Sequence, residues 1–289
     1  MKERFGFIFV MLTFGSIGLF VRNIHLSSSE IALYRAVIGS LVIILITVFL
    51  KQTTSFRIEK RDLILILLSG AAIGFNWMFL FEAYRYTTIA NATLSYYFAP
   101  VLVMLLAPVV LKEKWTLSKG IAFIIAVLGL FLVVNPEIDG TGPHHHLVGV
   151  SYGLLAAVLY ASVILINQFI KNMNSYQRTT VQLVVASIVL LPYVILTQGL
   201  SLPSFDVRSV IFLVILGVFH TGIANFFYFS LLPRLSAQTV SVMSYIDPIS
   251  AVFFSALFLG ETITPLQIVG GIFILGSTLM SELWQQKKT

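Results

Sequence analysis

The sequence predicts an all-α polytopic membrane protein in which ten transmembrane helices form two inverted five-helix repeats. Composition, the length of the apolar runs and an internal repeat support this prediction. Of the 289 residues, 58% are hydrophobic and only 10% are charged, whereas a soluble domain carries about 25% charged residues. This composition excludes a soluble fold, and the absence of cysteine excludes disulfides and thiolate chemistry.

The apolar runs have the length of membrane-spanning helices, because about 20 residues are needed to cross roughly 30 Å of hydrocarbon. Hydrocarbon offers the backbone no hydrogen-bond partner, so each uninterrupted run must bond within itself as a helix. The first run follows two cations but is followed by no small-residue cleavage site, and we interpret it as a membrane helix. The ten runs cover residues 5–21, 30–50, 63–81, 88–111, 117–134, 147–170, 179–197, 209–231, 235–259 and 264–283.

The loop cations predict the orientation. With the N-terminus inside, fourteen Lys and Arg residues lie on the inner face, and only Arg22, Arg85 and Arg208 lie on the outer face. Such an excess is typical of cytoplasmic loops. We therefore expect a multi-pass protein of the cytoplasmic membrane with both termini in the cytoplasm.

The repeat appears when the sequence is shifted by 148 residues. The segment Tyr97–Pro100 then aligns with Tyr245–Pro248, and Glu113 aligns with Glu261. Five helices separate equivalent positions, so the halves, residues 1–138 and 147–284, must insert in opposite orientations within one integral membrane unit. Inverted repeats are the architecture of many secondary transporters, which place their solute site near the bilayer midplane.

Asp247 is the main candidate for chemistry. It lies twelve residues from both ends of the 235–259 run, where an aspartate costs about 2.5 to 3.5 kcal/mol. A carboxylate there either binds a proton or cation in a cavity or forms structural hydrogen bonds. Its repeat equivalent is Ala99, so symmetry does not require an acid at this position.

Pro100 and Pro248 interrupt the fourth and ninth runs, where each removes a hydrogen-bond donor and bends the helix. They serve either as hinges for gating or as packing devices. Tyr97 and Tyr245 precede them by about one turn, and each offers an aromatic face and a hydroxyl at the candidate site.

Arg35 is a further charge inside a membrane run. It is a candidate ligand for a carboxylate or phosphate; alternatively it extends to the outer interface or pairs with Glu30 or Glu82. Other polar side chains within the runs form interhelical hydrogen bonds or line the site, and they are Asn76, Trp77, Gln182, His220 and Asn225. Small residues predict close packing of the fifth and tenth helices, namely Ala122, Ala126, Gly270, Gly271 and Gly276.

Enzyme and metal signatures are missing from the sequence. It contains no His-Glu-x-x-His, Gly-x-Ser-x-Gly or Walker motif, and Asp247 has no second membrane aspartate with which to share a proton. His144–His146 are adjacent in the loop between the halves, which we interpret as a solvated outer loop and not as a metal site. An intramembrane hydrolase using His220 and a serine is the alternative of another class.

The segments Phe81–Pro100 and Ser244–Glu261 resemble the EamA family of the drug/metabolite transporter superfamily, and the resemblance covers nearly the whole chain. In the first half, Lys112-Glu113 replaces the usual Gly-Glu. The resemblance implies a ten-helix inverted repeat with a central cavity, and by analogy a solute site around Asn76, Tyr97, Tyr245 and Asp247. It implies no catalytic residue.

The hypothesis from the sequence is a secondary transporter, not an enzyme, that exports small amphipathic metabolites such as amino acids by alternating access. Efflux of lipophilic cations or drugs is the alternative within transport. The candidate site comprises the binding residues Asn76, Trp77, Tyr97, Tyr245, Asp247, His220 and Arg35 and the hinges Pro100 and Pro248. The expected partners are a small-molecule solute and the lipid bilayer, with a proton and a second copy in a homodimer as further candidates; we expect no nucleic acid, metal or cofactor.

Overall fold

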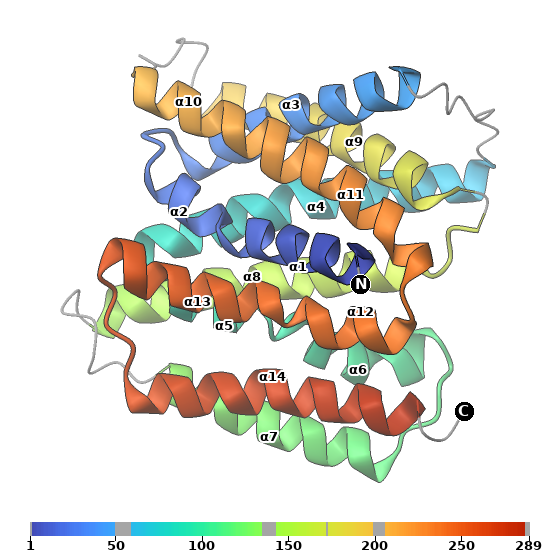
Figure 1. Ribbon diagram of the computed structural model, residues 1–289, viewed down its shortest axis with the longest axis vertical. Coiled ribbons are helices and arrows are strands. Elements are labelled where there is room, and N and C mark those ends of the chain that lie inside the picture. The colour runs from blue at the N-terminus through green and yellow to red at the C-terminus, as the bar shows by residue number, and fades with distance from the viewer. Residues whose placement is uncertain (1, 50–58, 135–142, 172, 199–205, 287–289) are drawn as a thin grey trace.

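The computed structural model describes residues 2–49, 59–134, 143–171, 173–198 and 206–286. Within these ranges the chain is all-helical, with eight apolar spans long enough to cross a membrane and two shorter ones. Figure 1 shows the spans side by side, with both termini at the same end of the bundle. The predicted fold class is confirmed.

Each half contributes five spans, and in both halves the fourth span is broken in the middle. The first half consists of α1 (Lys2–Gly15) with α2 (Ile17–Arg22), α3 (Ser28–Phe49), α4 (Lys60–Tyr86), α5 (Ile89–Tyr96) with α6 (Ala99–Val110), and α7 (Leu117–Val133). The second half consists of α8 (Pro143–Asn167), α9 (Ser175–Gln198), α10 (Val207–Ile215) continuing through a π-helical segment (Leu216–Ile223) into α11 (Ala224–Leu231) and a 3-10 turn (Leu232–Arg234), α12 (Ala237–Ser244) with α13 (Ile246–Leu259), and α14 (Pro265–Gln286).

The helix boundaries reproduce the repeat seen in the sequence. Shifting α5 by 148 residues gives the bounds of α12. The turn between α6 and α7, which contains Glu113, and the equivalent turn between α13 and α14, which contains Glu261, lie at opposite ends of the bundle in Figure 1. This arrangement is that of an inverted repeat.

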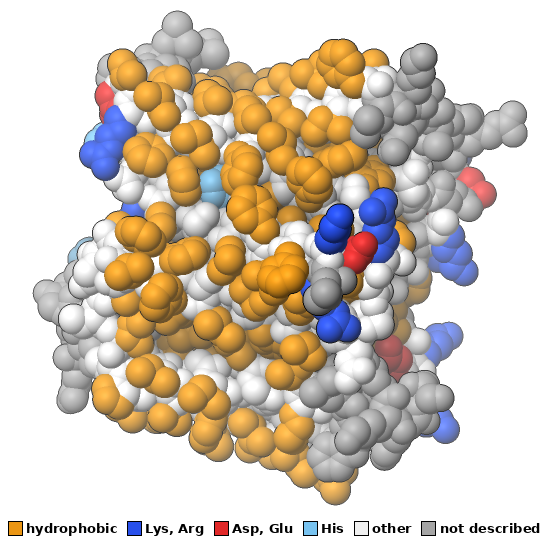
Figure 2. All heavy atoms as spheres, viewed as in Figure 1, with side chains coloured by type: hydrophobic (Ala, Val, Ile, Leu, Met, Phe, Trp, Pro, Cys, Tyr) orange, Lys and Arg blue, Asp and Glu red, His pale blue; other side chains and the backbone are white. Residues whose placement is uncertain are grey.

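The exterior is apolar between the two ends, as expected for a surface in contact with lipid. Figure 2 shows a nearly continuous hydrophobic face across the middle of the bundle, with charged side chains gathered toward the ends. Large apolar side chains such as Phe49, Phe131 and Leu196 are more than three-quarters exposed. In water such a surface would cause aggregation, whereas in a bilayer it is solvated by lipid chains.

Helices of the first half pack directly against helices of the second half. α4 packs against α8 and α9, and α7 packs against α14. Gly129 of α7 and Gly270 of α14 face each other so closely that a Cβ on either would lie 2.6 Å from the other's carbonyl oxygen. Close backbone approach of this kind drives helix association in membranes, where burial of apolar surface contributes little.

Two smaller expectations were wrong. The histidine triplet is not a solvated loop, because it forms the first turn of α8; His146 is buried and its Nδ1 lies 2.9 Å from the Thr87 hydroxyl. A Cβ added at Gly276 would meet no atom within 4 Å, so this glycine, unlike Gly270, is not needed for close helix packing. Ala122 and Ala126 are fully buried as expected, but their packing partners include Ala157 and Ala161 of α8.

The glycine contact gives a testable prediction. Gly270→Ala forces α7 and α14 apart because the new Cβ meets backbone, and overpacking of this kind costs about 1–3 kcal/mol. We expect a lower thermal unfolding midpoint in detergent. Gly276→Ala is the matched control in the same helix; it meets no atom within 4 Å, and the higher helix propensity of alanine should keep or raise the midpoint. Equal midpoints for the two variants would contradict the prediction.

Candidate functional site

The site is built on two helix breaks. Thr88 caps the start of α5 by accepting a hydrogen bond from the Asn91 amide, and α5 ends at Tyr96, two residues before α6 begins. α12 is capped in the same way by Ser236 and stops at Ser244, and Tyr245 separates it from α13. Pro100 and Pro248 lie in the first turn of α6 and α13, the helices that follow the breaks, where proline is tolerated because the first amides have no partner within the helix.

The Tyr97 hydroxyl donates a hydrogen bond to Asp247 Oδ2, which joins the two breaks across the repeat. Both side chains are partly exposed although they lie midway along their spans. The Tyr245 hydroxyl donates to Thr278 Oγ1 of α14 at 2.8 Å. The hydroxyls of the two equivalent tyrosines thus donate to different groups, an aspartate for Tyr97 and a threonine for Tyr245.

Further tyrosines surround this pair. The ring of Tyr96 packs against those of Tyr97 and Tyr160, with centroids 5.6 and 5.4 Å apart. Tyr96 ends α5 and Tyr160 lies on α8, so the two halves both contribute rings to this group. They were missed at the sequence level; the adjacent pair Tyr96-Tyr97 was the available signal, but aromatic residues are common throughout the chain.

Arg35 is the basic group of the interior. Its side chain is buried, Nε donates to Thr221 Oγ1 at 2.7 Å, and the guanidinium carbon lies 3.9 Å from the ring centroid of Trp77. A desolvated cation over an indole gains about 2 kcal/mol. Arg35 also interacts electrostatically with Asp247. These contacts replace the alternatives of an interfacial position or pairing with Glu30, whose carboxylate accepts from Ser27.

The π-helical segment Leu216–Ile223 presents Thr221 to Arg35. In this segment the Thr221 hydroxyl donates to the carbonyl five residues earlier, at Leu216. Short π-helical segments often occur at functional sites, but no sequence pattern predicted this one. His220, on the same segment, lies 2.9 Å from the Ser16 hydroxyl at the break between α1 and α2.

Asn76 is separate from this group. Its amide donates to the Ala156 carbonyl at 2.6 Å and is buried between α4 and α8. Gln182 likewise bonds to Ser69 and Asn167, and Asn225 to the Thr221 carbonyl. The structure thus brings together Arg35, Trp77, Tyr97 and Asp247, while Asn76 and Gln182 bond between helices.

In the described parts of the chain no three His, Asp or Glu residues form a potential metal site.

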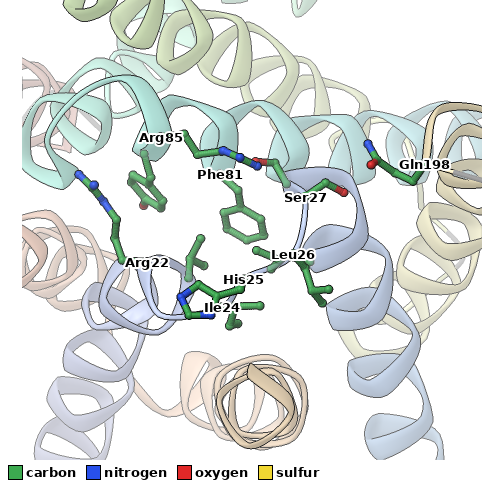
Figure 3. Close-up of a pocket in the computed structure, with 12 residues that line it drawn as sticks. Arg22, Ile24, His25, Leu26, Ser27, Phe81, Arg85 and Gln198 are labelled. Atoms are coloured by element: carbon green, nitrogen blue, oxygen red, sulfur yellow. The ribbon is translucent and has the colours of Figure 1, made fainter. Parts of the chain in front are cut away.

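A pocket of about 670 Å³ opens at the end of the bundle where α2 and α4 terminate. Figure 3 shows Phe81 at its centre, with Arg85 above and Ile24 and His25 below. Phe81 also lies 5.6 Å from the Arg35 guanidinium, so the pocket adjoins the buried cation. The lining residues are Val21, Arg22, Ile24, His25, Leu26, Ser27, Ser28, Ile31, Phe81, Tyr84, Arg85 and Gln198.

Comparison with known families decides the class of this protein. The profile of the EamA-like transporter family matches residues 2–135 and again residues 147–283. The chain belongs to the EamA-like transporter family. The resemblance noted in the sequence is therefore confirmed, and this EamA-like transporter is a multi-pass membrane protein.

Individual relatives agree with this assignment. An uncharacterized transporter of Bacillus subtilis, YxxF, is 29% identical over 96% of this chain and 88% of its own length. Human solute carrier family 35 member G1 is 25% identical over 93% of this chain and 76% of its own. A crystal structure with 16% identity shares the fold at a TM-score of 0.66, covering 98% of this chain and 99% of that one.

Family membership also decides between the classes considered for the interior site. The chain belongs to a family of membrane transporters, whose class implies a small-molecule solute, and the hydrolase alternative is excluded. The prediction that this protein is not an enzyme is confirmed.

Beside the pocket of this EamA-like transporter, Asp206 connects the α2–α3 loop to the start of α10. Its carboxylate accepts from the Ser209 amide at 2.6 Å and lies 2.8 Å from His25 Nδ1. The amide hydrogen bond, followed by the His25 contact, lowers the pKa of Asp206 to about 2. The folded-state pKa is thus below the usual value of about 3.9.

A group with a depressed pKa stabilises the fold above its unfolded-state pKa, and this contribution is lost as the pH falls through the folded-state pKa. We expect Asp206→Asn to lower the unfolding midpoint of the EamA-like transporter by a constant amount down to about pH 4, and the difference from wild type to shrink between about pH 4 and pH 2. Thermal unfolding of both proteins across this range measures it. A difference independent of pH would show that the charge of Asp206 is unimportant.

Proposed function

We propose that this transporter exports small zwitterionic or amphipathic metabolites, such as amino acids, by alternating access across the cytoplasmic membrane. One observation carries the proposal: within the described membrane spans an acid, Asp247, and a base, Arg35, are each held by aromatic and hydroxyl groups. A zwitterionic solute offers the complementary pair of charges, so both groups would remain paired when water is displaced.

Each of the two charged side chains forms a hydrogen bond with a residue of the other half. Arg35 comes from the first half and donates to Thr221 of the second, whereas Asp247 comes from the second half and accepts from Tyr97 of the first. A solute that replaces either hydrogen bond changes the contact between the halves. This is the coupling that alternating access requires, because a solute must bind the two states with different affinities to drive exchange.

We place Arg35, Trp77, Tyr97 and Asp247 in direct contact with the solute. Asn76, His220 and Tyr245 are proposed at the margins of the site, where their hydrogen bonds to Ala156, Ser16 and Thr278 hold the surrounding helices. Pro100 and Pro248 are proposed as hinges, since both lie in the first turn of a helix that follows a break. Asp247 is the proposed site of proton exchange.

Efflux of lipophilic cations is the second candidate. The tyrosine rings around Asp247 favour it, because aromatic faces and one carboxylate together bind organic cations. In that case Arg35 would have no role in solute binding. The two candidates therefore differ in their requirement for Arg35.

Flux into proteoliposomes with an imposed pH gradient, measured for amino acids and for organic cations, tests both candidates. Losing a hydrogen bond to a charged group costs about 1.5–3 kcal/mol, so Arg35→Ala and Asp247→Asn should each lower amino-acid flux about tenfold to hundredfold. Lys114→Ala, an exposed cation outside the site, is the control. Loss of flux only in Asp247→Asn favours organic cations, and unchanged flux in both variants contradicts both candidates.

We further propose that both termini lie in the cytoplasm and that residues 1–138 and 147–284 form the two halves. Lys114 and Thr262 are exposed and equivalent in the repeat, so they test the orientation. The chain has no natural cysteine. In intact cells an impermeant maleimide should label Thr262→Cys, and should label Lys114→Cys only after permeabilisation. The opposite pattern would reverse the orientation, and labelling of both from outside would contradict the inverted halves.

A further inference from the structure

The start of α5 is held by a glutamate from the other half. Glu261 accepts hydrogen bonds from the amides of Ile89 at 3.0 Å and Ala90 at 3.4 Å. Arg22 donates both to Glu261 and to the Thr87 carbonyl, and so connects the carboxylate to the end of α4. Because the first amides of a helix lack partners within it, a carboxylate at this position binds strongly.

A second polar contact reinforces this one. Gln267, in the first turn of α14, donates to the Asn91 side chain at 2.9 Å, and both residues are buried. The Glu261 side chain is only 10% exposed. The turn between α13 and α14 therefore closes over α5 at the end of the bundle that carries the Arg22 pocket.

The repeat predicts an equivalent contact at the opposite end. Shifted by 148 residues, Glu113 should accept from the amides of Ala237 and Gln238 at the start of α12. The two turns have the same backbone form, since Gly260 has φ +67° and its equivalent Lys112 has φ +58°. Glu113, however, pairs with Lys119 at 2.8 Å and is 46% exposed. Both helices have a local cap, Thr88 for α5 and Ser236 for α12, so the difference between the ends lies in the glutamate.

Burial shows the same asymmetry. Every residue from Ile89 to Ser95 of α5 is buried. The equivalent part of α12 is residues 237–243, and none of residues 238–243 is buried. The two broken spans are thus equivalent in the repeat but differ in the burial of their first helix.

We propose that Glu261 and Glu113 are alternating latches of the transport cycle. In the state described, Glu261 caps α5 beside the Arg22 pocket, and at the end that carries both termini Glu113 pairs with Lys119. In the opposite state Glu113 leaves Lys119 and caps α12, and Glu261 releases α5. These residues act by positioning the gates and do not touch the solute; the inference rests on the alternating access proposed above.

The natural absence of cysteine allows a matched test. Ala90 and Gln238 are equivalent in the repeat, but Ala90 is buried and Gln238 is exposed. With the full chain in lipid nanodiscs, where a charged thiol reagent reaches both ends, Gln238→Cys should react faster than Ala90→Cys. Adding Glu261→Gln should raise the rate at position 90 and lower the rate at 238, each by about fivefold to thirtyfold.

Glu113→Gln is the control. It removes the latch that is not engaged in this state, so position 90 should stay protected and position 238 should stay reactive. If Glu261→Gln does not fold, Arg22→Gln retains the carboxylate cap and removes only its cation, and should give a smaller shift of the same sign.

The reciprocal change is the decisive result. Local unfolding of one end would raise the thiol reaction rate at position 90 without lowering the rate at position 238. That outcome would overturn the latch, and so would unchanged rates at both positions. No solute is present in this test. A wrong cargo assignment would therefore leave the reciprocal pattern intact, whereas failure of the latch would leave the flux measurements unaffected.

Discussion

The need to satisfy every backbone hydrogen bond in hydrocarbon governs this structure. It makes each apolar run a helix and permits a break only where other protein groups replace the lost bonds. At the break between α1 and α2, the Ser16 hydroxyl donates to the Thr13 carbonyl and also lies 2.9 Å from His220 Nε2. At the π-helical segment, the Thr221 hydroxyl bonds to the Leu216 carbonyl. Ser16, His220 and Thr221 are therefore polar side chains that lie where the helices are irregular.

The same constraint explains why the interior charges have partners from the opposite half. An isolated charge in a membrane interior is costly, so Arg35 is placed against Trp77 and Thr221, and Asp247 is bonded to Tyr97. Thr221 and Tyr97 each come from the half opposite to the charge that they contact, whereas Trp77 belongs to the same half as Arg35. Relative movement of the halves therefore changes the environment of both charges.

Much of the fold followed from one-dimensional patterns, and much of the interior did not. Run length and the 148-residue shift predicted the ten spans, and proline predicted the breaks near Pro100 and Pro248. Repeat symmetry failed for the tyrosines, because Asp247 has no acidic equivalent and so Tyr245 bonds to Thr278 instead. The π-helical segment and the burial of His146 depend on packing between distant helices, which leaves no local pattern in the sequence.

Lys112 shows that the repeat is preserved in the backbone more strictly than in residue identity. Its φ of +58° matches that of Gly260 at +67°, although the left-handed region costs a residue other than glycine about 1–2 kcal/mol. If the turn keeps this backbone form throughout the proposed cycle, the conformational cost at Lys112 is the same whether Glu113 pairs with Lys119 or caps α12. The cost therefore favours neither of the two states. The departure from Gly-Glu in the first half is therefore compatible with equivalent turns. What distinguishes the ends is the partner of the following glutamate: a helix N-terminus for Glu261 and Lys119 for Glu113.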